Sequence, residues 1–168
     1  VVFDFGGCDR ASSRRRGGPA VSPVNAALAS VTDLVPGVPV AAQHESAQAL
    51  SAQGRMVIDL EAAVRDAGGL SADAHVDTAR VVDALAGVVD RAGWTSVAVV
   101  AHPVHLARCV ATCQRLGLRI VAAPTGHLAD LWDPSSSQWW TRGPARWTVR
   151  ELPVIAHQML TGRVLLRW

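Results

Sequence analysis

The chain alternates short, continuously apolar runs with longer stretches in which apolar residues recur at helical spacing. Short apolar runs that end at turn residues are typical of buried strands. We expect strands at five such runs, residues 1–5, 38–42, 55–60, 97–101 and 118–123. The amphipathic stretches predict helices over residues 24–32, 47–53, 77–92, 103–116 and 147–160.

Residues at the ends of these stretches support the assignment, most clearly in the second half. Asp77 is a favoured helix N-cap, and Gly93 follows the last apolar position of that helix, where glycine commonly ends one. Pro153 lies inside the last stretch, so this helix either kinks there or begins later. Strands that alternate with helices predict one α/β domain over residues 1–168, with a parallel sheet of about five strands.

The composition narrows the class of protein. The length of 168 residues fits one domain, and 49% hydrophobic with 18% charged residues excludes a disordered chain. The net charge is +2, and the one basic cluster, Arg14–Arg16, is interpreted as a solvated loop, with a phosphate contact as the alternative. We therefore expect a small-molecule ligand and no nucleic-acid partner.

Hydropathy and residue usage add expectations about location and chemistry. No apolar run approaches the roughly 18 residues of a membrane span, so we expect no membrane segment in this chain and a cytoplasmic location, with an anchor upstream of Val1 left open. All 16 basic residues are Arg, which excludes Schiff-base and P-loop chemistry, because both need a lysine. Three scattered cysteines do not form a disulfide framework, so a reducing compartment is expected.

Candidate functional residues follow the predicted strands, because ligands of α/β sheets bind beyond the carboxyl ends of the strands. Gly6 and Gly7 follow the first strand and predict a close backbone approach, either to a ligand or to a neighbouring loop. Glu45 follows the second strand. His105 and Arg108 follow the fourth, on one face of a helix start, where they could hold a phosphate or carboxylate. The alternative is an ordinary polar surface.

Two further patterns have competing interpretations. His105, Cys109 and Cys113 have zinc-ligand types at i, i+4, i+8, but both cysteines fall on the apolar stripe, so we expect core packing and no metal. The segment 128–147 contains four tryptophans together with Arg142 and Arg146. It predicts either a binding loop that stacks on a planar or sugar ligand, or a plug for the open end of a small core.

Several motifs in order resemble the YdcF/SanA/ElyC family, a group long described as a domain of unknown function. The motifs are Gly6–Gly7, Asp77–Thr78, Gly93–Trp94–Thr95–Ser96–Val97, His105–Leu106–Ala107–Arg108, Leu116–Gly117, Glu151–Leu152 and Gly162–Arg163. The likeness is good over the second half of the chain and looser over the first. Some members of that family are linked to the bacterial cell envelope.

The resemblance implies a Rossmann-like three-layer domain with a polar pocket above the sheet. It also implies a nucleotide-like ligand, with S-adenosylmethionine as the candidate cofactor. Within the site it implies His105 as an acid/base or ligand donor and Arg108 as an anion clamp. Together with Glu45 and Arg142, the predicted ligand-binding residues are Gly6, Gly7, Glu45, Thr78, His105, Arg108, Arg142 and Glu151.

The function expected from these observations is binding of an anionic or nucleotide-like small molecule, with or without catalysis. The second hypothesis is an envelope-associated or regulatory binding module without turnover. The third is a phosphoester hydrolase.

Overall fold

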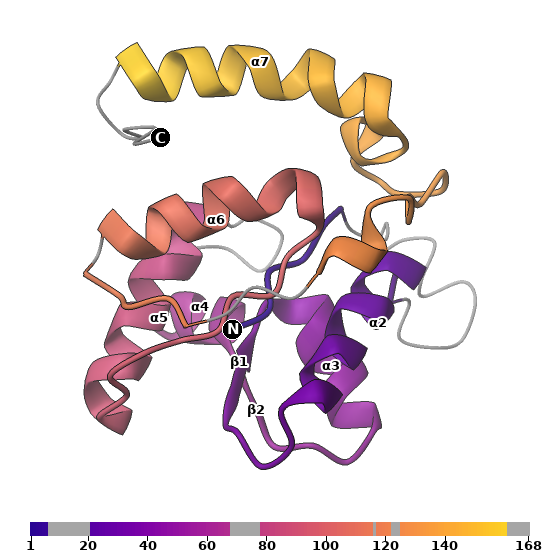
Figure 1. Cartoon of the computed structure of the whole chain (residues 1–168). Coiled ribbons are helices and arrows are strands. Elements are labelled where there is room, and N and C mark those ends of the chain that lie inside the picture. Colours follow the sequence, from indigo (N-terminus) through magenta and orange to yellow (C-terminus); the bar gives the residue numbers. More distant parts are fainter. Residues whose placement is uncertain (7–20, 68–77, 116, 122–124, 161–168) are drawn as a thin grey trace.

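The structure is a computed structural model, and it describes residues 1–6, 21–67, 78–115, 117–121 and 125–160. Helices predominate, and the two regular strands lie near the centre of the molecule (Figure 1). The elements are α2 (Pro23–Ser30), η1 (Val31–Leu34), β1 (Val40–Ala42), α3 (His44–Ala52), β2 (Val57–Asp59), α4 (Leu60–Asp66), α5 (Thr78–Ala92), α6 (Pro103–Arg115), η2 (Gly126–Leu128), η3 (Trp139–Thr141) and α7 (Pro144–Leu160).

The predicted helices are confirmed, with shifted ends. α5 ends before Gly93, which has a φ of +65°, and α6 starts at Pro103. α7 starts at Pro144, not at Trp147, and continues through Pro153. α4 was not predicted, since 55–60 was interpreted only as a strand. Its start depends on Asp59, whose carboxylate accepts hydrogen bonds from the N–H groups of residues 61 and 62.

The predicted five-stranded, Rossmann-like sheet is wrong. Among the described residues, only β1 and β2 form a ladder, a parallel one with Val40 opposite Val57, and helix accounts for 59% of residues against 8% for strand. The other expected strands make isolated parallel bridges: Val2 with Ala42 and Val100, and Val97 with Ile120.

Side chains explain why the first segment does not extend the ladder. The N–H groups of Val2 and Phe3 donate to the carbonyls of residues 41 and 100. The next N–H, that of Asp4, donates to Oε1 of Gln43 at 2.9 Å, and the N–H of Phe5 donates to Oδ1 of Asn25 at 2.7 Å. Side-chain acceptors thus replace the backbone carbonyls that regular pairing requires.

Two hydrophobic clusters lie on opposite sides of these extended segments. Val2 and Phe5 pack with α2, α3 and Trp147, whereas Phe3 packs with α4, α5 and α6. The neighbouring side chains of Val2 and Phe3 therefore point to opposite clusters, as in an extended strand, whereas Phe5 lies in the cluster of Val2 and departs from strict alternation. The segment ends between the starts of α3 and α6, where polar residues gather. No helix in the described part of the chain is both long and apolar enough to cross a membrane.

Candidate functional site

Three of the predicted site residues come together where α7 lies over α6. His105 is in the first turn of α6, and its Nδ1 accepts a hydrogen bond from Nη2 of Arg108 at 3.0 Å. Nε of Arg108 lies 3.4 Å from Oε1 of Glu151, on α7. The i, i+3 spacing of His105 and Arg108 therefore does place them together, as the sequence predicted.

Burial controls the protonation of this cluster. It holds the pKa of His105 well below its ordinary value, and the positive charge of Arg108 lowers that pKa further, so the imidazole is neutral at pH 7. Burial also lowers the pKa of Arg108, against the effect of Glu151, and raises the pKa of Glu151, against the effect of Arg108. The cluster therefore consists of the ion pair between Arg108 and Glu151 together with a neutral His105. The Nδ1 lone pair of His105 accepts the hydrogen bond from the Arg108 guanidinium.

Aromatic rings enclose the cluster on the side of the core. The indole of Trp147 lies 5.7 Å from the ring of His105, and the guanidinium carbon of Arg108 lies 5.8 Å from the same indole. His102, which is fully buried, stacks on Phe5 with ring centroids 4.0 Å apart. These contacts anchor the start of α7 on α6 and leave His105 and Arg108 little exposed.

A second polar cluster lies at the start of α3. The Asp4 carboxylate accepts hydrogen bonds from the N–H groups of Glu45 and Ser46, at 2.9 and 3.0 Å, and from the Ser46 hydroxyl. Oε2 of Glu45 accepts from the N–H of Ser22 at 3.0 Å and from the amide of Asn25 at 2.9 Å. Predicted residue Glu45 thus contacts Asp4 and Asn25, two residues that the sequence reasoning missed.

The position of Asp4 in this cluster is unfavourable for its charged form. Burial raises the pKa of Asp4 to about 7, because desolvation outweighs the three hydrogen bonds that favour the carboxylate, and nearby Glu45 adds to the increase. The raised value is the clearest sign that this end of the first segment is unusual. An aspartate immediately before a buried Phe and a glycine could have signalled it in the sequence.

His44 and Asp59 form a pair that the sequence reasoning also missed. Nδ1 of His44 lies 2.7 Å from Oδ2 of Asp59, and the Gln48 amide nitrogen lies 2.8 Å from Nε2, so a neutral imidazole donates through Nδ1. Burial alone would raise the pKa of Asp59, but His44 and two backbone N–H groups lower it overall. His44 follows β1 and Asp59 ends β2, so both lie at the carboxyl ends of neighbouring parallel strands, which is the signal that could have identified them.

The remaining predicted residues have different surroundings. Gly6 has a φ of +80°, and a Cβ there would lie 2.6 Å from Oγ1 of Thr141 and 2.7 Å from Oγ of Ser136. The sequence left open whether the backbone here approaches a ligand or a neighbouring loop, and for Gly6 the structure shows the approach to a neighbouring loop. Thr78 is the first residue of α5 and, within the described ranges, makes no hydrogen bond to the other predicted site residues. Gly7 lies outside the described residues.

The two cysteines of α6 are core residues, as predicted. Cys109 and Cys113 are fully buried in the cluster that contains Leu85. Burial raises the pKa of both thiols, that of Cys113 to about 11, so neither is a thiolate at neutral pH. The searched part of the chain contains no group of three or more His, Cys, Asp or Glu side chains that could hold a metal ion.

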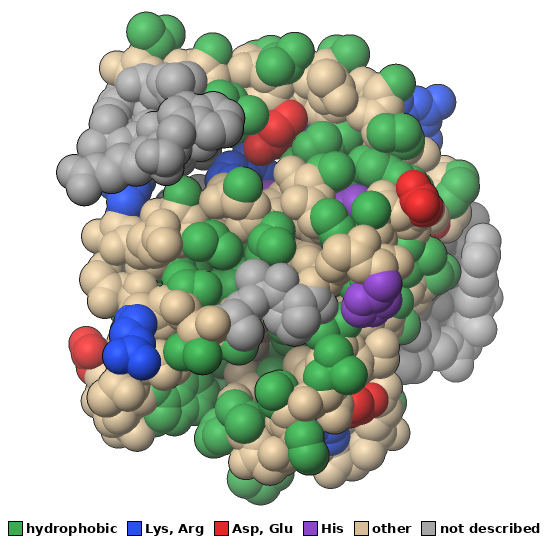
Figure 2. Space-filling model, in the orientation of Figure 1, with side chains coloured by type: hydrophobic (Ala, Val, Ile, Leu, Met, Phe, Trp, Pro, Cys, Tyr) green, Lys and Arg blue, Asp and Glu red, His purple; other side chains and the backbone are tan. Residues whose placement is uncertain are grey.

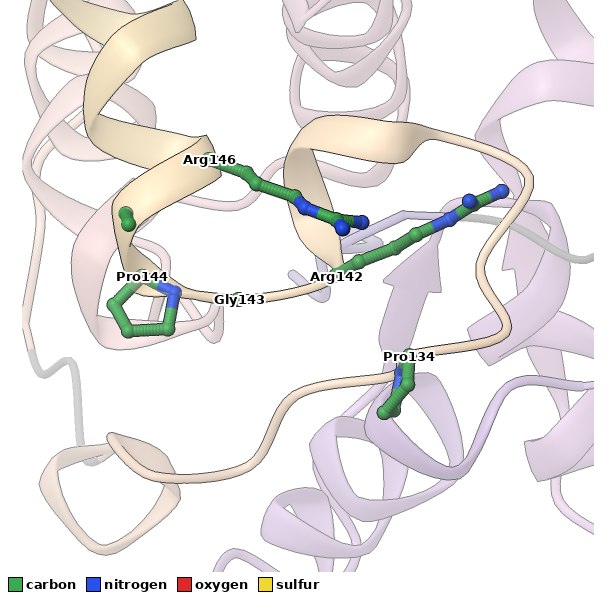
Figure 3. Close-up of a pocket in the computed structure, with 6 residues that line it drawn as sticks. Pro134, Arg142, Gly143, Pro144 and Arg146 are labelled. Carbon is green, nitrogen blue, oxygen red and sulfur yellow. The ribbon is translucent and has the colours of Figure 1, made fainter.

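Predicted residue Arg142 lines a pocket at the start of α7 (Figure 3). The pocket has a volume of about 360 Å³ and opens to solvent. Nε of Arg142 donates a hydrogen bond to the carbonyl of Ser136 at 2.7 Å, and this bond fixes the arginine side chain. Figure 3 shows the side chains of Arg142 and Arg146 extending in the same direction, one from the loop and one from the helix. The lining residues are Pro134, Arg142, Gly143, Pro144, Ala145 and Arg146.

Comparison of the sequence with models of protein families and with curated proteins, and of the fold with solved structures, finds no match. The functional argument therefore rests on the geometry of this chain.

Proposed function

We propose that the protein binds a small anionic molecule through a phosphate or carboxylate group in the pocket at the start of α7. The observation that carries the proposal is the lining itself, which contains two guanidinium groups and no acidic residue. Guanidinium groups bind phosphates and carboxylates with paired hydrogen bonds. Within the described residues, Arg146 makes no ion pair that would compensate its charge.

The helix supports the same conclusion. α7 has 17 residues, begins with Pro144 and has no acidic residue in its first turn. The unsatisfied N–H groups and the dipole at such an end attract an anion. The carboxylate of Asp133, which directly precedes the lining residue Pro134, is buried and accepts hydrogen bonds from Ser135.

Three other helix starts, those of α2, α3 and α4, differ in this respect. The chain supplies its own oxygen acceptors there: Ser22 at α2, Asp4 at α3 and Asp59 at α4. The start of α7 instead combines two arginines with an open pocket, which is the arrangement expected where the acceptor comes from a ligand.

The buried contacts position this pocket. Trp147 and Glu151 fix the first turns of α7 on α6, and the bond from Arg142 to Ser136 fixes the loop before it. The motifs shared with the YdcF/SanA/ElyC family, and the nucleotide-like ligand they imply, are compatible with the proposal. An acid/base role of His105 stays a prediction.

Calorimetric titration of the full chain with inorganic phosphate and with acetate tests the proposal. We expect phosphate to bind more tightly at low ionic strength, because salt screens an exposed site. Arg146→Gln should weaken binding about tenfold or more, which corresponds to roughly 1.4 kcal/mol. Arg119→Gln, which changes an exposed arginine away from the pocket, is the matched control and should bind like the unchanged protein.

Circular dichroism would show whether the Arg146→Gln variant is folded. If that folded variant and the unchanged protein bind phosphate equally well, or if neither anion binds, the proposed function is wrong.

A further inference from the structure

α7 exposes large aliphatic side chains of a kind that a helix on the edge of a domain normally buries. Val149 is 66% exposed, Leu152 is 62% exposed and Leu160 is 88% exposed. The helix lies along the outer edge of the molecule (Figure 1), and Figure 2 shows hydrophobic side chains along this edge. This observation is independent of the pocket.

The exposed residues form one face. Val149, Leu152, Ala156 and Leu160 are spaced at i, i+3, i+7 and i+11, which places them in one stripe along a helix. Trp147 and Glu151, on the opposite side, are buried against the body of the protein. α7 is therefore apolar on its outward face as well as at its anchored side, a pattern typical of a helix with a second partner.

The charged side chains along one border of this apolar stripe are both basic. Arg146 and Arg150 lie one turn apart along one border of the stripe, and the guanidinium carbon of Arg150 lies 5.3 Å from the ring centroid of Trp140. The one acidic residue of α7, Glu151, is on the buried side and pairs with Arg108. Glu151 also feels the charge of Arg150, but its carboxylate lies on the buried side. The border of the outward face itself therefore presents only basic side chains.

We propose that this outward face of α7 docks an amphipathic helix of a partner protein. Apolar residues of that helix would cover Val149, Leu152 and Leu160, and Asp or Glu side chains along its border would pair with Arg150, since Arg146 lines the anion pocket. This is a helix-packing interface with a charged border that selects the partner and its direction.

Charge also argues against a second copy of this chain as the occupant. In an antiparallel pair related by a twofold axis, the basic border of one α7 faces the basic border of the other. In a parallel pair, each basic border faces Thr148 and Ile155, which supply no negative charge. A membrane surface fits less well than a helix, because the stripe has no aromatic residue and is basic along one border only.

Fluorescence anisotropy of the full chain with a labelled synthetic peptide tests the proposal. The peptide has about 18 residues, enough to match α7, with leucines on one face and glutamates along one border. We expect saturable binding. Leu152→Asp should weaken it at least tenfold, while Met56→Asp, at a position that is 94% exposed and outside α7, should leave it unchanged.

Reversing the charges on the peptide and on the protein distinguishes specific pairing at the basic border from nonspecific hydrophobic binding. A peptide with lysines in place of glutamates should bind the unchanged protein at least tenfold more weakly, and Arg150→Glu should reverse this preference. Phosphate titration of Leu152→Asp should match that of the unchanged protein, which separates this surface from the anion pocket.

Three results would overturn the proposal: no binding of the acidic peptide, equal binding by Leu152→Asp, or no reversal by Arg150→Glu. Self-association in sedimentation that Leu152→Asp abolishes would identify a second copy as the occupant instead. Flotation with phosphatidylserine vesicles that depends on Leu152, without peptide binding, would identify a membrane.

Discussion

Gly6 is surrounded by the hydroxyl groups of Ser136 and Thr141, which lie where a side chain at this position would begin. Both hydroxyl-bearing residues are buried, and Thr141 donates to Ser136 at 2.8 Å. The glycine thus lets the turn before α7 close over the end of the first extended segment. Through this contact it helps to position Arg142, because Arg142 donates to the carbonyl of the same Ser136.

Gly6→Ala should destabilise the protein by roughly 2–4 kcal/mol, from the positive φ together with the overlap with two hydroxyl groups. Gly37 is the matched control, since its φ is +77° and nothing lies within 4 Å of a Cβ there. Gly37→Ala should therefore cost only about 1–2 kcal/mol. Urea denaturation of both variants measures the difference, and equal losses would contradict the packing argument.

At the residue scale, sequence reasoning succeeded where a contact depends on local spacing. His105 and Arg108 share a helix turn, so their contact could be predicted. Asp4 was missed, because its partners are Glu45 and Ser46, about 40 positions away, and no local pattern encodes that distance.

α6 and α7 are connected mainly by side chains near the start of α7. The pair of Arg108 and Glu151 joins the two helices, and Trp147 covers it. Beyond Glu151, α7 exposes Leu152 and Leu160. The orientation of the outward face therefore depends on a few contacts within the first two turns of the helix.

Glu151→Gln should loosen this connection, because it leaves the partly buried Arg108 without a carboxylate. We expect faster amide hydrogen exchange along α7 and a loss of about 1–3 kcal/mol in the free energy of unfolding. The control is Glu61→Gln, which removes a comparable ion pair with Arg65, at 2.9 Å, but within a single helix, α4. Exchange along α7 that changes equally in both variants would refute the role of Glu151.

At the element scale, helix starts were harder to predict than helices. The sequence pattern placed the second predicted helix at residue 47, whereas the corresponding α3 starts at His44 because Asp4 caps it from another part of the chain. α4 was missed because its cap, Asp59, also ends a strand. Apolar periodicity locates the middle of a helix, but these ends depend on tertiary partners.

At the scale of the whole molecule, the apolar pattern predicted three buried extended segments, at 1–5, 40–42 and 97–101, but not how they pair. The expected burial of 55–60 and 118–123 is wrong for the described residues, since Met56, Ile58 and Val121 are exposed. Buried runs such as 97–101 are central, as expected, yet ladders need consecutive backbone bonds. Asn25 and Gln43 take two of the N–H groups that a strand at residues 1–5 would use. Nothing in the local pattern of the first segment reveals these distant side chains.

The raised pKa of Asp4 should make stability depend on pH. Its value is about 7 in the folded protein against an ordinary 3.8, so the folded state binds the proton more tightly. The contribution of Asp4 to the free energy of unfolding is therefore greatest below about pH 4 and falls as pH rises through 7, by up to roughly 4 kcal/mol.

Chemical denaturation at several pH values between 4 and 8 measures this change. Asp4→Asn should remove this falling contribution, so the free energy of unfolding of the variant should fall less, or rise more, with pH than that of the unchanged protein, in which the buried His102 and His105 contribute the opposite trend. Asp130→Asn, at an exposed position, should leave the slope as it is. A profile that keeps its slope in the Asp4→Asn variant would exclude this origin.

The first extended segment has partners on both sides, and this fixes when it can be completed during synthesis. Val2 bonds to residues near 41 on one side, while Phe3 donates to the carbonyl of Val100 on the other. At roughly 5–20 residues per second, a ribosome needs about 3–12 s to synthesise the chain between those two partners. Phe3 is buried among residues of α5 and α6, so during that interval it lacks part of its cover, and this apolar segment stays partly exposed until residue 100 and α6 have been synthesised.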